Sequence, residues 1–144
     1  MKRQLTKRST KTANRKVTKK VTKKVTKESL PKTLEKTQRV FNAYIRNRDE
    51  GLCCISCGGN NGNQAGHYFP VKGFSALRFH EWNVNLQCPG CNLFLHGNQA
   101  MYRIGLEKKI GEKAVRELED IAVKNRVYKW SIDELKEIIS KDEK

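Results

Sequence analysis

The 144-residue chain is strongly basic: 30 lysines and arginines stand against 15 aspartates and glutamates, for a formal net charge of +15. This balance argues against an ordinary metabolic enzyme, and the length suits one domain, since domains usually run to roughly 100 to 200 residues. No apolar run approaches the ~18 residues of a membrane span, and no apolar stretch follows the basic N-terminus as in a secretory signal. We therefore expect a protein of a reducing cytoplasm that has polyanionic partners and no membrane contact.

The positive charge is concentrated in an N-terminal arm. Residues 1–27 contain 12 lysines and arginines and no acid, whereas the rest of the chain has a net charge of only +3. The repeated Val-Thr-Lys-Lys of this arm offers little to bury, which predicts a disordered segment over residues 1–29. A solubilising tail is one interpretation. Because basic runs release counterions from nucleic acid, we favour a phosphate-binding arm whose contacts include Lys16, Lys19, Lys20, Lys23 and Lys24.

Residues 30–144 are expected to form a single zinc-stabilised α+β domain. Pro31 and the apolar spacing that follows it predict a helix over residues 31–49. Glycines and prolines then divide residues 52–92 into short strands and turns, with candidate strands at 64–68 and 76–80. Amphipathic helices are predicted at 99–110 and 112–125, and Ser131 with Glu134 forms a capping box that starts a last helix.

Four of the five cysteines form two Cys-x-x-Cys pairs, Cys54 with Cys57 and Cys88 with Cys91. In a reducing compartment this pattern is more typical of metal ligands than of disulfides. A two-residue gap lets one tight turn present both sulfurs to a tetrahedral ion, so the sequence predicts one structural Zn²⁺. Cys53 could replace Cys54 only with a longer gap, and we expect it to be a small buried residue.

Three polar residues accompany this cysteine frame in a fixed order: His67, Asn83 and Asn92. Asn83 stands five residues before the third cysteine of the frame, and Asn92 directly follows the fourth. This arrangement resembles the HNH or ββα-metal endonucleases, and its knuckle spacing is similar to that of phage recombination endonuclease VII. The resemblance implies a small ββα-metal core, flanked here by helices, that holds one divalent ion against a scissile phosphate.

A closer resemblance, over residues from about 38 to 120, is to the phage NinG/Rap recombination proteins. It implies a structure-selective DNA endonuclease for branched intermediates such as four-way Holliday junctions, working in the cytoplasm of a bacterial host. The motifs that carry it are Phe41-Asn-Ala-Tyr-Ile-Arg46, Arg48-Asp49, Cys54-Ile-Ser-Cys57-Gly58, Ala65-Gly66-His67-Tyr68, Leu77-Arg78-Phe79, Glu81, Asn83, Gln87-Cys88, Cys91-Asn92, Gly97-Asn98 and Tyr102-Arg103.

The resemblance assigns roles that agree with the chemistry of phosphodiester hydrolysis. His67 is the expected general base, because a neutral imidazole near pH 7 can activate a water. Asn92 is the expected ligand of one catalytic Mg²⁺ or Mn²⁺, since its amide oxygen is a hard donor. Asn83 is expected to orient the imidazole or to brace the loop. Many HNH sites have an acid beside the first histidine, where this chain has Gly66. Glu81 and His96 are the candidates for the second metal ligand.

Phosphate contacts are also expected from Arg46, Arg78 and Arg103, and no segment resembles a base-reading helix. Symmetric cutting of a four-way junction would suit a homodimer, although the sequence shows no identifiable interface. Two functions therefore stand side by side: a metal-dependent nuclease, and a non-catalytic zinc module that binds nucleic acid through its arm.

Overall fold

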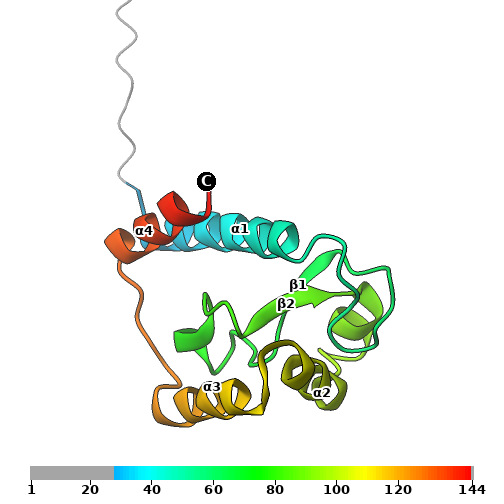
Figure 1. The fold of residues 1–144 in the computed structure, drawn as a ribbon. Coiled ribbons are helices and arrows are strands. Elements are labelled where there is room, and N and C mark those ends of the chain that lie inside the picture. The colour runs from blue at the N-terminus through cyan, green and yellow to red at the C-terminus, as the bar shows by residue number, and fades with distance from the viewer. Residues whose placement is uncertain (1–27, 144) are drawn as a thin grey trace, which may run out of the picture.

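The computed structural model describes residues 28–143 and begins with a long helix, α1 (Leu30–Arg48). Pro31 lies in its first turn, and Thr33, Thr37, Phe41 and Ile45 form a buried face at four-residue spacing. The C-terminal helix α4 (Ile132–Asp142) lies beside α1, as Figure 1 shows, so the two ends of the domain are adjacent. The predicted capping box of α4 is confirmed.

A two-stranded antiparallel sheet lies between this helical pair and the rest of the molecule (Figure 1). Strand β1 (Gln64–His67) pairs with β2 (Val84–Gln87) so that His67 faces Val84 across the sheet. The prediction of a strand at residues 76–80 is wrong. That region forms the short 3-10 helix η1 (Ser75–Leu77) because local turns, such as His80 N to Leu77 O, satisfy its backbone.

The true second strand was missed because all four of its residues are buried. A strand buried on both faces has no alternation of polar and apolar residues, and Asn85 and Gln87 also made it look polar. The amide N–H groups of both side chains find partners inside the protein, among them Tyr102 Oη for Asn85 and Ser56 Oγ for Gln87.

Helices α2 (Gln99–Ile110) and α3 (Glu112–Lys124) cover the other side of the sheet, close to their predicted ranges. Gly111 joins them with a φ of 88°, a conformation that favours glycine. Their inward side chains form the larger apolar core together with residues of the loop after β1. Its buried members are Tyr68, Leu77, Tyr102, Leu106, Val115, Leu118 and Ala122.

A buried carboxylate ties three elements together at the end of α1. Asp49 is 1 % exposed and accepts hydrogen bonds from Arg48, from Lys109 Nζ at 2.7 Å and from the backbone N–H of Leu86 at 3.0 Å. Burial alone would raise the pKa of Asp49, but hydrogen bonds from Arg48 and Lys109 outweigh it and hold that pKa below its ordinary value. The network fixes β2 against α1 and α2.

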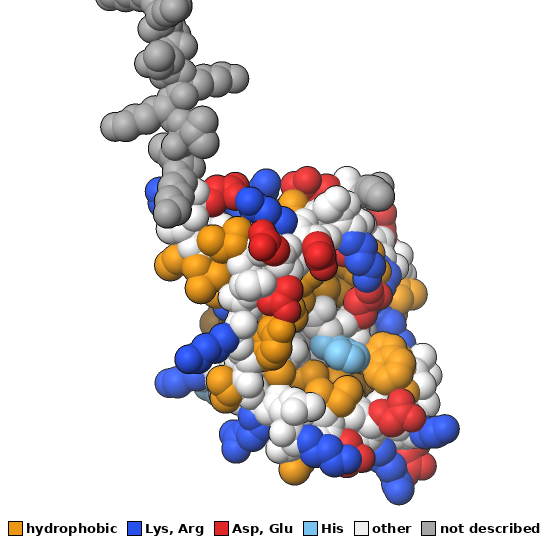
Figure 2. Space-filling model, turned by 90° about the vertical axis from the view of Figure 1, so that its left-hand side faces the viewer, with side chains coloured by type: hydrophobic (Ala, Val, Ile, Leu, Met, Phe, Trp, Pro, Cys, Tyr) orange, Lys and Arg blue, Asp and Glu red, His pale blue; other side chains and the backbone are white. Residues whose placement is uncertain are grey.

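The observed architecture is thus α+β, as predicted. Positive and negative side chains are mixed over the face shown in Figure 2, which agrees with the small net charge outside the arm. Within residues 28–143, no helix is both long enough and apolar enough to cross a bilayer. Of the arm predicted to be disordered over residues 1–29, residues 1–27 lie outside the described residues, and so do the five lysines assigned there to phosphate binding.

Candidate metal centre and catalytic pocket

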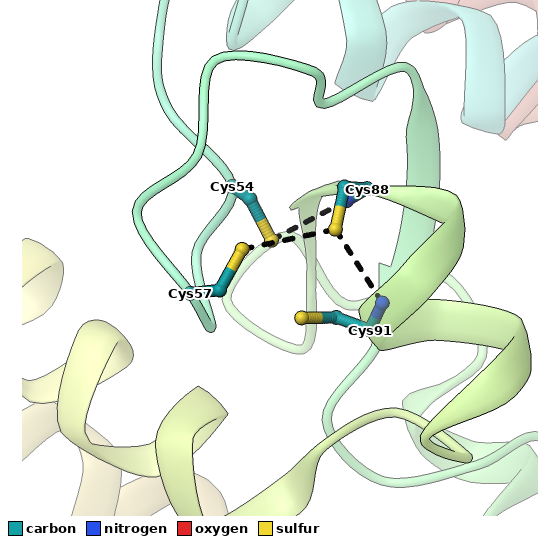
Figure 3. A group of neighbouring side chains, drawn as sticks. All are labelled: Cys54, Cys57, Cys88 and Cys91. Atoms are coloured by element: carbon teal, nitrogen blue, oxygen red, sulfur yellow. Dashed lines mark hydrogen bonds between the residues drawn. The ribbon is translucent and has the colours of Figure 1, made fainter.

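The four cysteines of the two predicted pairs converge on one point (Figure 3). Cys54 and Cys57 come from the loop before β1, and Cys88 and Cys91 come from the turn that follows β2. The four sulfurs all lie within 4.8 Å of one another. Segments more than 30 residues apart in sequence therefore present a four-thiol cluster that could hold a metal ion.

The spacing of the sulfurs fits zinc. Zn–S bonds of about 2.3 Å place tetrahedral sulfurs about 3.8 Å apart. The Cys57 and Cys88 sulfurs are 3.8 Å apart. Three N–H groups also point at the cluster: Cys88 N donates to Cys54 Sγ, Cys91 N to Cys88 Sγ, and Asn98 Nδ2 to Cys91 Sγ. Donors of this kind stabilise thiolates, the form in which cysteine binds metal.

The acidity of one thiol shows the same effect. Burial would raise the pKa of Cys54, but backbone N–H groups of Cys57, Cys88 and Ser56 outweigh it and lower the pKa to about 7. Cys53, by contrast, is exposed, and its thiol hydrogen-bonds the Asn60 side chain at 3.2 Å. The expectation that Cys53 is buried is therefore wrong, because the loop that carries it turns Cys54 inward and leaves Cys53 on the outside.

His67 is the last residue of β1 and pairs with Val84 of β2. Its Nε2 is 3.1 Å from the carbonyl oxygen of Arg78. A carbonyl only accepts hydrogen bonds, so Nε2 carries the proton and Nδ1 is left with a lone pair. Burial lowers the pKa of His67, although the Arg78 carbonyl acts in the opposite direction. The imidazole is therefore neutral at pH 7 with Nδ1 able to accept a proton.

Asn83 braces the loop and makes no side-chain hydrogen bond to the imidazole. The side chain is fully buried; its Oδ1 accepts from Phe69 N at 2.7 Å, and its Nδ2 donates to the carbonyl oxygens of Phe69 and Leu77 at 3.0 Å. Leu77 is the neighbour of Arg78, whose carbonyl holds His67. Of the two roles expected for Asn83, the structure thus supports bracing, while the orienting group is a backbone oxygen that no side-chain pattern could reveal.

Asn92 lies on the π-helical turn η2 (Gly90–Phe94), which starts directly at the second cysteine pair. Its Nδ2 donates to Gln64 Oε1 at 2.8 Å, so the amide is held with its Oδ1 turned away from Gln64. Asn92, His96 and His67 line one open pocket of about 390 Å³, together with Pro70, Val71, Gly97 and Gln99. The structure therefore brings together three of the residues that the sequence singled out.

A buried glutamine supports this pocket and explains the glycine before His67. Gln87 Nε2 donates to Ser56 Oγ and to the carbonyl oxygen of Gly97, at 2.8 and 2.6 Å. A Cβ on Gly66 would lie 2.0 Å from Gln87 Oε1, so no side chain fits at position 66. No sequence pattern indicates this role, because the burial of a glutamine is evident only once its partners are placed.

Glu81 does not lie in the pocket, contrary to its assignment as a metal ligand. Its carboxylate accepts hydrogen bonds from Tyr44 Oη at 3.0 Å and from Lys141 Nζ at 2.6 Å, which places it between α1 and α4. Hydrogen bonding from Lys141 lowers the pKa of Glu81. It thus serves as a structural ion-pair partner, and no carboxylate lines the pocket in the described part of the chain.

The three arginines expected to bind phosphate differ in their surroundings. Arg103 is paired with Glu107 at 2.6 Å and with Glu119 at 2.9 Å, so its assignment to phosphate is not supported. Arg78 donates to Gln38 Oε1 at 2.7 Å and is half-buried. Arg46 is exposed and lines a separate pocket.

Comparisons with known proteins point to phages. The family model described as "Bacteriophage Lambda NinG protein" matches residues 1–144. Protein ninG of Escherichia phage lambda is 42 % identical over 103 residues, covering 70 % of this chain and 49 % of the relative. Protein ninG of Escherichia phage 933W is 40 % identical over 106 residues, covering 72 % and 51 %, and that of Salmonella phage P22 is 41 % identical over 103 residues, covering 70 % and 49 %. The chain spans about half the length of these relatives, and no solved structure matches it.

Proposed function

This chain belongs to the phage NinG family, and from its site we propose that it is a metal-dependent DNA endonuclease of the HNH type that cuts branched recombination intermediates. The observation that carries the proposal is the pocket lined by His67, Asn92 and His96 beside a four-cysteine cluster. The names of the relatives state no activity, so the proposal rests on the chemistry of these residues.

His67 supplies the base. Hydrolysis of a phosphodiester needs a water that loses its proton as it attacks phosphorus. The Nε2–H of His67 is donated to the Arg78 carbonyl, which leaves Nδ1 as the acceptor, and its lowered pKa keeps it unprotonated at neutral pH. The hydrogen bond to a backbone oxygen also holds the imidazole ring in place, so the base is already oriented before the reaction.

Asn92 and His96 are the residues that would hold the divalent ion. Asn92 Oδ1 is a hard oxygen donor, and Mg²⁺ commonly binds through one or two protein ligands plus substrate phosphates and waters. The donor set of the pocket fits such an ion, with the DNA phosphate supplying much of the remaining coordination. When bound, the ion would stabilise the negative charge that develops on the phosphate. With an amide where carboxylates are usual, we expect weak metal binding until DNA is present.

The four cysteines would hold a structural Zn²⁺ that fixes Asn92. Asn92 follows Cys91 directly, and its backbone N–H donates to Cys88 O at 2.9 Å, so the metal centre and the pocket share one turn. Contacts of the arm with DNA, through Lys16 and the lysines that follow it, belong to the same proposal, since a run of basic residues binds phosphates without reading sequence.

Cleavage of labelled DNA tests the proposal. A four-way junction, a flap and a linear duplex are incubated with the zinc-loaded full chain, with Mg²⁺, with Mn²⁺ or with neither. We expect metal-dependent cuts near the branch that disappear in His67→Ala, while zinc content and junction binding are retained. His80→Ala is the matched control, because His80 contacts the Trp82 backbone and does not line the pocket.

Two outcomes contradict the proposal. Tight binding of the junction without cuts in either metal would indicate a non-catalytic zinc module that binds nucleic acid. Wild-type cutting rates in His67→Ala would remove His67 from the base role.

A further inference from the structure

Three consecutive large apolar side chains stand exposed beside the pocket. Leu93, Phe94 and Leu95 are 57 %, 78 % and 59 % exposed, and we call residues 93–95 the apolar turn. Single exposed apolar residues are common on soluble proteins, but a contiguous group of large ones marks an interaction site. The folded protein therefore leaves exposed a group of side chains whose burial against a partner would be favourable.

The turn that carries these side chains is firmly held. Cys91 is buried in the metal centre, and backbone hydrogen bonds run from Leu95 N to Gly90 O at 3.0 Å, from Gly97 N to Cys91 O at 2.9 Å and from Asn98 N to Leu95 O at 2.8 Å. His96 and Asn98 both have positive φ angles, 48° and 45°, a conformation that costs a non-glycine residue of order 1 kcal/mol. The surrounding structure thus holds the apolar turn in this exposed conformation despite the cost of the two positive φ angles.

The position of the apolar turn connects it with the proposed active site. Asn92 precedes it and His96 follows it, and both line the pocket that contains His67. A nucleic acid can occupy both places at once, with a phosphate in the pocket and a base on the apolar turn.

The charge of this part of the chain also favours a nucleic acid. Between Gly51 and Leu106 there is only one acidic residue, Glu81, and it is neutralised by Lys141. Ten of the 15 acids of the chain lie instead on α1, α2, α3 and α4. The residues that line the pocket and those of the apolar turn therefore carry no negative charge that would repel phosphates.

We propose that the apolar turn is a wedge that packs against unpaired or unstacked bases at the branch point of a DNA substrate, with Phe94 stacking on a base. This inference rests on the proposed endonuclease function and names how that site would select its substrate. Phenylalanine and leucine are typical wedge residues, and they must overcome the cost of unstacking a base step. That cost is lowest where a base is already unpaired, so the wedge favours branched DNA over duplex without reading sequence.

The test measures binding separately from cutting. Zinc-loaded full-length His67→Ala keeps the DNA intact, and a four-way junction with 2-aminopurine at the branch reports unstacking or stacking through its fluorescence. In this background we expect Phe94→Ala to weaken junction binding roughly 5- to 150-fold, the range for loss of one stacked base, and to remove the fluorescence change. Affinity for linear duplex should change less than about twofold, and Phe94→Trp should retain junction binding.

Val123→Ala is the matched control, because Val123 is also 78 % exposed but lies on α3 and does not line the pocket. Unchanged junction affinity in Phe94→Ala, or equal losses on junction and duplex, would overturn the wedge. So would a wild-type dimer that Phe94→Ala converts to a monomer in sedimentation, since the apolar turn would then be a subunit interface.

The two proposals can fail independently. A wild-type chain that shows the fluorescence change but cuts in neither metal would overturn the nuclease and support the wedge. Metal-dependent cutting that is as selective in Phe94→Ala as in wild type would overturn the wedge and support the nuclease.

Discussion

Gly105 of α2 lies directly against Ile55, the residue after Cys54, and Gly105→Ala should destabilise the protein strongly. A Cβ at this position would lie 1.8 Å from the carbonyl oxygen of Ile55 and 2.9 Å from its carbonyl carbon. Real Cβ atoms essentially never come closer than 3.0 Å to a neighbour, so the two backbones would have to separate by at least 1.2 Å. No rotamer change relieves the contact, because both groups belong to the main chain.

The cost can be set against the gain that alanine brings to a helix. Overpacking usually costs 1 to 3 kcal/mol, and a main-chain contact belongs at the upper end, about 3 kcal/mol. Better helix propensity returns about 1 kcal/mol. The net loss is about 2 kcal/mol, which for a domain of this size lowers Tm by roughly 8 °C. The separation would also loosen the loop between Cys54 and Cys57, so zinc should be released faster to a chelator.

Thermal unfolding of the zinc-loaded proteins, followed by circular dichroism, measures the difference. Gly90→Ala is the matched control, since its Cβ would meet Cys88 Sγ at an ordinary 3.7 Å, and its Tm should stay within about 2 °C of wild type. If Gly105→Ala melted at the same temperature as Gly90→Ala, α2 would not lie against Ile55 as described.

Three further predictions concern the buried charge, the metal and the base. Asp49→Ala leaves the Arg48 and Lys109 charges without their buried partner, and urea unfolding should show a loss of stability of about 3 to 5 kcal/mol. Asp120→Ala removes only an exposed ion pair with Lys124 and should cost less than about 1 kcal/mol. Similar losses in the two variants would contradict the buried network. Metal analysis should find one zinc per chain. A strong chelator should unfold the segments around both cysteine pairs, which faster amide hydrogen exchange would detect. If metal removal left the exchange rates unchanged, the folding of these segments would not depend on a metal. Because burial lowers the pKa of His67, the cleavage rate should rise with pH with a midpoint below 6.5 and be level at neutral pH. A midpoint above 6.5 in the pH–rate profile would contradict the burial of this base.

The lowered pKa values of His67 and Asp49 also predict how the stability of the protein depends on pH. His67 has a folded pKa below its unfolded value, so the unfolded chain takes up the proton first, and stability falls as pH drops below 6.5. Asp49 also has a lowered folded pKa, so its contribution is present above about pH 4 and is lost as pH falls through the folded value. Both groups therefore make the protein less stable in acid.

Much of this protein can be derived from its sequence because the determining signals are local. The paired cysteines, the capping box at Ser131 and the apolar spacing of α1, α2 and α3 each depend on residues a few positions apart, and the structure has them as expected. The order of His67 and Asn92 around the cysteine frame also predicted from sequence that the two residues belong to one site, and they do line one pocket.

Tertiary structure decided the features that depend on partners distant in sequence. The second strand is Val84–Gln87, where the side-chain N–H groups of Asn85 and Gln87 find buried partners, whereas the amino-acid types alone gave the opposite indication. Glu81 pairs with Lys141, sixty positions later in the chain, and does not line the pocket, and the orienting group of His67 is a main-chain oxygen common to every residue type. Sequence determines which chemistry the chain carries, through spacing and residue type. Which of those groups meet, and which remain exposed as Phe94 does, is decided only when burial and long-range hydrogen bonds select one arrangement.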